Sequence, residues 1–341
     1  MTLTVSLATA SYPILIERGA IRRVGSLFSL NRRVLIVTDD GVPKEYAERV
    51  AKAAKEPTVV TLAQGEDTKS LASFEKLLSL LLEKGFTRSD CIVAVGGGVI
   101  GDLCGFVASA YMRGIDFYNV PTTLLAMVDS SIGGKTGVNY GAIKNPIGAF
   151  YQPKGVLIDA DVLATLPPRH VASGLAECIK MALTFEKALF DLIESLPDPI
   201  TAIETIIFRA LRIKKLVVEK DEKEAGLRRV LNFGHTLGHA IESDREANKL
   251  YHGECVALGM LPMCSDSIRT RLYPLYERLG LPTSVKLDLS RAKEALRHDK
   301  KSKGERVIGV TVNEIGSYTL TELSYATLDG YLDQFPERSN R

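Results

Sequence analysis

The sequence has almost no excess of charge of one sign. Its 43 Lys and Arg residues stand against 41 Asp and Glu residues, which gives a formal net charge of +2 over 341 residues. A protein that binds nucleic acid or an anionic membrane surface needs a concentrated basic face. The charge balance therefore predicts neither partner. The short basic group Lys300, Lys301 and Lys303 fits a solvated loop or a small anionic substrate.

A long uninterrupted apolar run is also missing. The most apolar stretch, residues 92–112, contains Asp102 and five glycines. We therefore interpret it as a buried strand, a loop and a helix, and not as a membrane span. Residues 1–16 have neither the basic nor the apolar segment of a secretory signal. No membrane partner is expected.

Cysteine is scarce, and its pattern excludes a disulfide framework. The five cysteines are odd in number and lack CxxC spacing, and most stand in apolar stretches where cysteine behaves as a small hydrophobic residue. Reduced thiols and a cytoplasmic location are the simplest interpretation.

The first half of the chain alternates strand-like apolar runs with helical patterns. Strands are predicted at 33–39, 57–62, 91–95 and 116–120, and helices at 42–55 and 70–85. This alternation predicts a Rossmann-like α/β domain over residues 1–160, with a mostly parallel sheet. Its ligand site is expected beyond the carboxyl ends of the strands.

After about residue 161 the pattern becomes helical. Helices are predicted at 168–183, 188–196, 200–220, 237–248, 256–279 and 290–298, with a short β-like piece at 306–312 and 317–320. The second domain, residues 161–341, is therefore expected to be mainly α-helical, with the functional site in the cleft between the domains.

A glycine-rich loop follows the predicted strand 91–95 and opens a helix. Residues 96–101 formally fit GxGxxG, whose glycines let the backbone approach a pyrophosphate at a helix N-terminus. The pattern is weak by itself, because a triple glycine also serves a tight turn. Acidic loops at 39–41 and 65–69 could accept hydrogen bonds from ribose hydroxyls, or could simply cap helices.

A second loop is rich in small and polar residues. Gly133-Gly134-Lys135 resembles part of a phosphate loop, but the spacing GxxxxGK[ST] is absent, which excludes Walker-type chemistry. A lysine flanked by glycines still suits a phosphate or carboxylate. Lys144 and Asn145 offer a second cation and an amide nearby.

The histidines give the sharper signal. His235 and His239 stand at i and i+4 on one helix face, as in HExxH sites but without the glutamate. His252 follows shortly afterwards, and Glu177 lies in a helix of small residues. One carboxylate with two imidazoles is the open pattern of catalytic zinc. A single histidine is more often structural, and the spacing does not decide which two imidazoles would bind.

Arg228 and Asn232 stand just before these histidines. Taken together, the motifs resemble those of the 3-dehydroquinate synthases, in the same order and over nearly the whole chain. The segments that carry the resemblance are 96–102, 111–114, 121–139, 144–148, 173–180, 231–239, 252–254 and 299–301.

The resemblance implies a role for each matching residue. It makes Glu177, His235 and His252 the ligands of zinc or cobalt and places His239 on the substrate side. The NAD-contacting positions are Asp39, Glu66, Lys69, Gly97, Gly98, Asp102, Thr122, Thr123, Leu125, Asp129, Lys135, Lys144, Thr165 and Leu166. The positions that contact the substrate or take part in catalysis are Arg113, Lys135, Asn145, Lys180, Lys214, Arg228, Asn232, His239 and one of Lys300 or Lys301. The chain departs from the family at His170, where glutamate is common, so the cofactor contact of that glutamate is not carried over.

The activity implied is the conversion of 3-deoxy-D-arabino-heptulosonate 7-phosphate to 3-dehydroquinate and phosphate, a step of the shikimate pathway. In such an enzyme NAD takes a hydride from the substrate and returns it within one turnover, so that phosphate is eliminated before the ring closes. The resemblance also implies a homodimer in which Arg113 reaches the neighbouring active site.

Three alternatives stay open. Another sugar phosphate cyclase would act on a substrate without a carboxylate, and a metal-dependent polyol dehydrogenase of the same fold would release reduced cofactor. An inactive nucleotide-binding scaffold has no use for an open metal site, so the three candidate ligands disfavour it.

Overall fold

The computed structural model describes residues 1–141, 143–244, 249–298 and 306–337. The chain divides into two compact units. The first consists of Met1–Leu166 with Lys214–Lys223, and the second of Pro167–Ile213 with Glu224–Arg341. Helix α7 (Ile203–Lys220) is therefore shared, because its last residues pack with the first unit.

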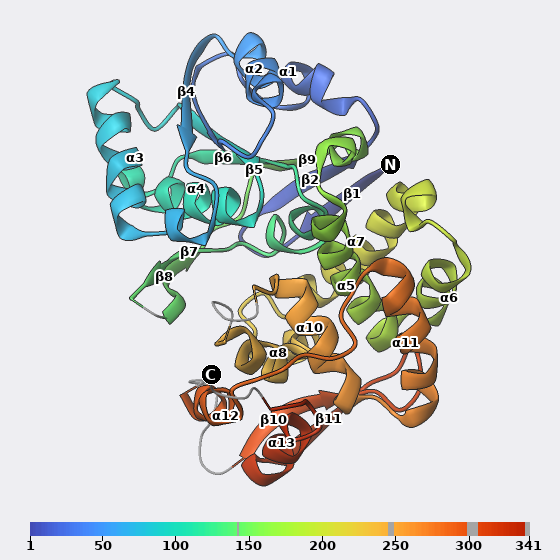
Figure 1. The fold of residues 1–341 in the computed structure, drawn as a ribbon. Coiled ribbons are helices and arrows are strands. Elements are labelled where there is room, and N and C mark those ends of the chain that lie inside the picture. The colour runs from blue at the N-terminus through green and yellow to red at the C-terminus, as the bar shows by residue number, and fades with distance from the viewer. Residues whose placement is uncertain (142, 245–248, 299–305, 338–341) are drawn as a thin grey trace. The chain divides into compact units, whose positions relative to one another are not determined.

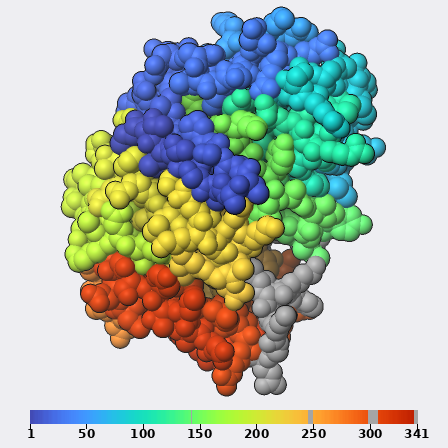
Figure 2. All heavy atoms as spheres, turned by 180° about the vertical axis from the view of Figure 1, so that it is seen from behind, coloured from blue at the N-terminus to red at the C-terminus, as the bar shows by residue number. Residues whose placement is uncertain are grey.

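The first unit is built on a seven-stranded sheet of order β1-β2-β9-β6-β5-β3-β4. All neighbouring strands run parallel except β1 and β2, which are antiparallel. The strands are β1 (Thr2–Ser6), β2 (Ser11–Ile16), β3 (Arg33–Asp39), β4 (Glu56–Leu62), β5 (Cys91–Gly96), β6 (Asp116–Pro121) and β9 (Gly155–Ile158). The N-terminal strands, dark blue in Figure 2, lie at the surface, as β1 is an edge strand.

Helices cover both faces of this sheet, with α2 and α4 on opposite sides in Figure 1. They are α1 (Val24–Leu27), α2 (Lys44–Ala53), α3 (Leu71–Glu83) and α4 (Gly98–Ala110), with short 3₁₀ turns at Ala20–Arg23, Glu66–Thr68, Tyr111–Arg113 and Ala160–Thr165. The central strand β5 is buried at every residue, because it has a strand on each side and a helix layer above and below. Its side chains join Leu35 and Val37 of β3 and Leu103 and Val107 of α4 in one apolar core. The predicted Rossmann-like α/β architecture is confirmed.

The second unit is mainly helical, as predicted. Its helices are α5 (Pro168–Phe185), α6 (Lys187–Ser195), the first part of α7, α8 (His235–Glu242), α10 (His252–Met260), α11 (Asp266–Leu279), α12 (Leu289–His298) and α13 (Tyr325–Leu332), with 3₁₀ turns at Pro199–Ala202, Leu227–Asn232 and Leu261–Met263. An antiparallel hairpin, β10 (Arg306–Thr311) and β11 (Thr319–Ser324), completes it. Helix α5 is buried without a break from Val171 to Thr184 and packs against α6 and α10.

Several boundaries differ from the predictions. The helix expected over 256–279 is two helices, α10 and α11, separated by a 3₁₀ turn at Leu261–Met263. Pro262 inside that turn has no N–H to continue the helix. The helix expected over 237–248 begins earlier, at His235, and ends at Glu242; residues 245–248 lie outside the described residues.

Two local features of the first unit were also missed. The loop around Lys135 forms a β-hairpin, β7 (Lys135–Tyr140) with β8 (Ile143–Phe150). The helix that begins at the glycine loop ends at Ala110, and Met112 and Arg113 take left-handed φ angles of 49° and 66°. Arg113 therefore does not extend the helix.

Candidate active site

The first unit gathers its candidate cofactor residues where β3, β4, β5 and β6 end. The chain passes outward from β3 to β4 and then from β5 to β6 in the opposite direction, so the order reverses between β3 and β5. Ligands of open parallel sheets bind beside such a reversal. Asp39 ends β3, and the glycine loop follows β5. The structure thus places these two predicted segments at one edge of the sheet.

The glycines at the start of α4 are required by close contacts. A β-carbon on Gly98 would lie 2.9 Å from Ser130 Oγ, and one on Gly97 would lie 3.2 Å from a methyl carbon of Thr123. Gly97 is the N-cap residue of α4, and no side chain caps the helix there. The first-turn N–H groups of α4 therefore point to a position that an anion can take.

Lys69 and Asp102 form a shielded ion pair beside this helix start. Lys69 is 5% exposed, and its Nζ lies 2.5 Å from Asp102 Oδ2. Burial raises the pKa of Asp102, while the charge of Lys69 acts in the opposite direction. The two predicted cofactor residues hold each other in place.

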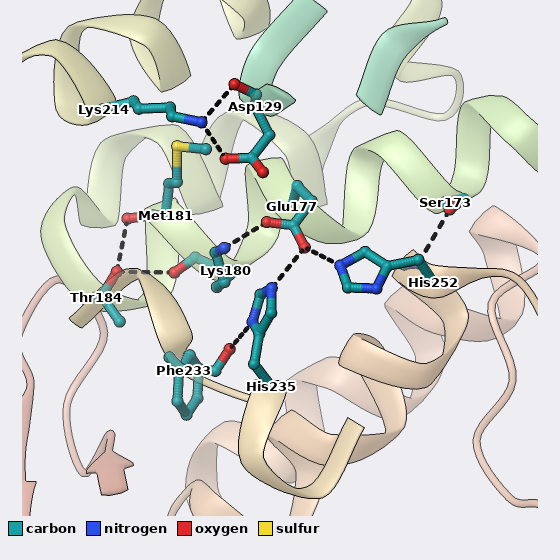
Figure 3. A network of polar contacts seen from close by, with 11 residues as sticks. Asp129, Ser173, Glu177, Lys180, Met181, Thr184, Lys214, Phe233, His235 and His252 are labelled. Carbon is teal, nitrogen blue, oxygen red and sulfur yellow. Dashed lines mark hydrogen bonds and ion pairs between the residues drawn. The ribbon is translucent and has the colours of Figure 1, made fainter. Parts of the chain in front are cut away.

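Other predicted residues of this unit are connected in the same way. Asn139 donates to Glu66 Oε1 over 2.8 Å, and Lys214 Nζ donates to Asp129 Oδ1 over 2.5 Å (Figure 3). Asp39 accepts the N–H of Gly41 over 3.0 Å, which stabilises the turn after β3. Burial raises the pKa of Asp39.

The remaining predicted residues of the first unit fall into two groups. Thr122, Thr123 and Leu125 are buried or half-buried just after β6, while Thr165 bonds to the Tyr46 hydroxyl over 3.1 Å and precedes Leu166. Lys135, Lys144 and Asn145 lie exposed on the β7–β8 hairpin. Asn145 takes a left-handed φ of 52° and donates its N–H to Asn139.

In the second unit the three predicted metal ligands meet. Glu177 comes from the middle of α5, His235 from the first turn of α8 and His252 from the first turn of α10 (Figure 3). Glu177 Oε1 lies 3.7 Å from His235 Nε2 and 3.9 Å from His252 Nε2. Donor atoms of all three lie within 4.8 Å of one another. Tetrahedral ligands at about 2.1 Å from a zinc ion are roughly 3.4 Å apart, so a small contraction would complete the site.

The carboxylate of Glu177 also has the chemistry of a metal ligand. Its side chain is fully buried, and neither oxygen receives a hydrogen bond from any residue that the structure describes. The Lys180 ammonium group lies against Oε2, on the next turn of α5. A buried carboxylate that lacks well-formed hydrogen bonds is costly, and a divalent cation beside the Lys180 ammonium group would offset that cost.

The two imidazoles present their Nε2 atoms to Glu177. His235 Nδ1 lies 3.2 Å from the carbonyl oxygen of Phe233, which fixes the ring (Figure 3). Burial, with smaller contributions from the charge of Lys180 and from the neighbouring imidazoles, holds the pKa of His235 well below its ordinary value. A neutral imidazole has the lone pair that a metal needs. The donor set therefore fits a divalent transition metal.

The substrate-side residues are distributed over both units. Lys180 is 2% exposed and Arg228 is 4% exposed, while His239 is exposed one turn after His235. Asn232 donates to Glu224 over 2.7 Å. Lys214 belongs to the first unit, whereas Arg228 and Asn232 belong to the second. Lys300 and Lys301 lie outside the described residues.

Several side-chain contacts fix the start of α10, the helix that carries His252. Arg169 binds Glu254 with two hydrogen bonds of 2.6 and 2.7 Å and lies over the Tyr251 ring. Gly253 donates to Ser173 Oγ over 3.1 Å, so the helix start is joined directly to α5. His170 stacks on Tyr251 with ring centroids 4.4 Å apart, which gives this departure from the family a packing role.

Sequence reasoning missed two polar residues of the sites. Asn139 lies between Glu66 and the backbone of Asn145. Glu242 lies 3.5 Å from His252 Nδ1. Its spacing of three from His239 and seven from His235, on one face of α8, was a signal that could have identified it.

Comparison with solved structures defines the class of protein. A 2-deoxy-scyllo-inosose synthase complexed with carbaglucose-6-phosphate, NAD⁺ and Co²⁺ superposes with a TM-score of 0.89 at 26% identity, over 98% of this chain and 100% of that chain. A 2-epi-5-epi-valiolone synthase from Streptomyces hygroscopicus subsp. jinggangensis, with NAD⁺ and Zn²⁺ bound, gives 0.87 at 27% identity, over 96% and 98%. The fold is that of the sugar phosphate cyclases.

Sequence comparison gives the family within this class. The N-terminal model of 3-dehydroquinate synthase matches residues 59–173, and the C-terminal model matches residues 174–302. The 3-dehydroquinate synthase of Enterococcus faecalis is 42% identical over 98% of this chain and 99% of its own length. The chain belongs to the 3-dehydroquinate synthase family.

Proposed function

We propose that this protein converts 3-deoxy-D-arabino-heptulosonate 7-phosphate to 3-dehydroquinate and phosphate. The main evidence is that Glu177, His235 and His252 meet, and that the buried Glu177 carboxylate is paired with Lys180 but accepts no well-formed hydrogen bond from the described residues. Three protein donors leave coordination positions for substrate oxygens. The identity of 42% to a curated synthase, over nearly the full length, supports this substrate over those of the more distant cyclases.

The metal proposed for this donor set is zinc or cobalt, the ions present in the two similar structures. When bound, such an ion supplies Lewis acidity to the substrate's oxygens. The chain contributes two neutral imidazoles in fixed orientations and one carboxylate that offsets charge. Lys180, buried against Glu177, brings a further cation to the site.

NAD is proposed to bind at the carboxyl edge of the first unit's sheet. Its pyrophosphate suits the N-terminus of α4 at Gly97 and Gly98, where backbone N–H groups face outward. The Lys69–Asp102 pair lies beside this position. Asp39 and Glu66 offer carboxylates to the ribose hydroxyls.

The substrate residues are proposed to bind two anionic ends of one molecule. The planar guanidinium of Arg228 suits a carboxylate, assisted by Asn232 of the same unit. Lys214 is proposed as a further cation for the substrate. Lys135, Asn145 and one of Lys300 or Lys301 suit the phosphate. His239 lies on the same helix face as the ligand His235 and is proposed to contact the substrate. Such binding positions the reacting groups, and no nucleophile is required.

We also propose a cytoplasmic homodimer. All five cysteines are free and buried, which fits a reducing compartment. In the part of the chain that the structure describes, no helix is long and apolar enough to cross a membrane.

The test is turnover of 3-deoxy-D-arabino-heptulosonate 7-phosphate by the zinc-loaded protein with catalytic NAD. Phosphate and dehydroquinate should form in equal amounts, without accumulation of reduced nicotinamide, because the hydride returns within each turnover. The His235→Ala variant should lose this activity and serves as the control. Reduced cofactor accumulating in proportion to product would indicate a dehydrogenase. Equal or better turnover of sedoheptulose 7-phosphate would indicate another cyclase.

A further inference from the structure

Glu242 is a buried carboxylate that the proposed function does not use. It is the last residue of α8, the helix that begins at His235, and it is 7% exposed. Positions 235, 239 and 242 are separated by four and three residues, so they share one face of the helix. The helix that supplies one metal ligand therefore also brings a carboxylate towards the other imidazole.

Glu242 contacts Nδ1 of His252, the ring nitrogen that faces away from Glu177. Its Oε2 lies 3.5 Å from His252 Nδ1, while Nε2 of the same ring lies 3.9 Å from Glu177 Oε1. A carboxylate accepts a hydrogen bond but cannot donate one when ionised. The proton of a neutral His252 is therefore drawn to Nδ1, and the lone pair is left on Nε2, facing Glu177.

His235 shows the same arrangement with a different acceptor. Its Nδ1 lies 3.2 Å from the Phe233 carbonyl oxygen, and its Nε2 faces Glu177 Oε1 at 3.7 Å. In both imidazoles, therefore, Nδ1 faces a hydrogen-bond acceptor and Nε2 faces the carboxylate of Glu177. The backbone supplies the acceptor for His235, and a side chain supplies it for His252.

We propose that Glu242 is a positioning residue that fixes the tautomer and ring orientation of His252 for metal binding. This inference rests on the proposed metal site at Glu177, His235 and His252. A carboxylate bonded to a ligating imidazole raises its basicity as well as orienting it, and its loss typically costs ten- to a hundredfold in metal affinity.

One competing arrangement is a second metal ion. Donor atoms of His239, Glu242 and His252 also lie within 4.8 Å of one another. That site would use His252 Nδ1 as a ligand, so the nitrogen could not also carry the proton that Glu242 accepts. Metal stoichiometry separates the two arrangements.

The experiment measures zinc affinity by chelator competition in full-length wild-type, Glu242→Ala and Glu242→Gln proteins. We expect one zinc ion per chain in all three. Affinity should fall about ten- to a hundredfold in Glu242→Ala and less in Glu242→Gln, whose amide oxygen still accepts a hydrogen bond. The matched control is Asp244→Asn, because Asp244 is also a buried carboxylate, two residues along the chain, and it accepts the N–H of Asp288. Its zinc affinity should be that of the wild type.

A spectroscopic measurement separates positioning from general destabilisation. In the cobalt-substituted protein, proton NMR should show two strongly shifted, exchangeable imidazole N–H signals, one for each ligand histidine. The Glu242→Ala change should speed the exchange of one signal with water and leave the other unaffected, because His235 keeps its carbonyl acceptor.

Wild-type affinity and unchanged signals in Glu242→Ala would overturn the inference. Two ions per wild-type chain and one in Glu242→Ala would favour a second metal site instead. The proposed function fails separately if His235→Ala and His252→Ala bind zinc as tightly as the wild-type protein.

Discussion

Among single residues, Glu177 is completely buried, and its oxygens accept no well-formed hydrogen bond from the described residues. Its charge is balanced by Lys180 and, in our proposal, by a metal ion. We expect Glu177→Gln to retain the fold but to lose at least tenfold in zinc affinity, because the amide neither offsets charge nor coordinates as strongly. Metal content after dialysis against a chelator measures this. The control is Glu186→Gln, whose carboxylate pairs with Arg209 elsewhere in the same unit; undiminished zinc retention by Glu177→Gln would contradict the assignment.

His170 provides a pH-dependent test at the same scale. Burial against Tyr251, and then the charge of Arg169, lower the pKa of His170. As the pH falls below about 6.5, the ordinary pKa of histidine, His170 becomes protonated in the unfolded chain before it does in the folded chain. Stability contributed by neutral His170 is therefore complete above that pH and is lost as the pH falls towards the lower folded pKa.

The measurement compares urea unfolding midpoints of the wild type and His170→Gln between pH 5 and 8. The pH-dependent contributions of the other histidines to stability are common to both proteins and cancel in this comparison. The advantage of the wild type should shrink as the pH falls below about 6.5. An advantage that is constant or grows towards acid pH would show that the folded environment does not disfavour the charged ring.

The sequence predicted the residues of the metal site better than their orientation. Periodicity places His235 and His239 on one helix face, but it cannot say which ring turns towards Glu177. That choice depends on the Phe233 carbonyl and on where α10 places His252, both of which are tertiary features. Spacing left the choice of ligands open; the family resemblance predicts Glu177, His235 and His252, and the structure brings these three side chains together. Glu242 was missed because a glutamate at the end of a helix most often faces solvent.

At the scale of elements, the crossing of α8 and α10 depends on glycine. A β-carbon on Gly259 of α10 would lie 2.2 Å from the Gly234 carbonyl oxygen and 2.7 Å from the Gly238 nitrogen. The helices that supply His235 and His252 therefore meet with backbone against backbone. Their close approach sets the separation of the two imidazoles, whose ring centroids are 5.2 Å apart.

We expect Gly259→Ala to destabilise the protein by about 1–3 kcal/mol, the usual range for overpacking, and to weaken zinc binding. Thermal unfolding and chelator competition measure the two effects. Gly330→Ala is the control, because Gly330 lies in α13 with nothing within 4 Å of an added β-carbon. Alanine there should gain about 0.5–1 kcal/mol. If Gly259→Ala were as stable and bound zinc as tightly as Gly330→Ala, helices α8 and α10 could move apart without loss of stability or of zinc affinity.

The elements themselves were predictable where one periodicity dominates. Strands β3 and β5 and helices α3 and α5 begin and end within a few residues of their predicted bounds. The α10–α11 break was missed because apolar residues continue through it and only Pro262 marks it. The β7–β8 hairpin was missed because its sequence, rich in glycine and polar residues, has little of the alternation that marks a half-buried strand.

For the molecule as a whole, the predicted substrate-binding role of Arg113 is not explained by the structure of a single chain. It is exposed and has a left-handed φ of 66°. Helix α4 starts at Gly98 beside the proposed cofactor position and runs for 13 residues, about 20 Å at 1.5 Å per residue. Arg113 therefore lies near the amino edge of the parallel sheet, just before β6 begins at Asp116. The edge of its own sheet at which we propose that NAD binds is at the far end of that helix.

A substrate-binding role for Arg113 therefore requires a second chain, in which it would reach the substrate phosphate across a symmetric interface. We expect Arg113→Ala and His235→Ala to be inactive separately and to regain about a quarter of wild-type activity after equimolar subunit exchange. Half of the dimers would then be hybrids, each with one intact site. Mixing Arg113→Ala with the double variant Arg113→Ala/His235→Ala should restore nothing, because no site has both groups. A fully active monomer, or hybrids without recovery after confirmed exchange, would leave Arg113 as a surface residue at the end of α4.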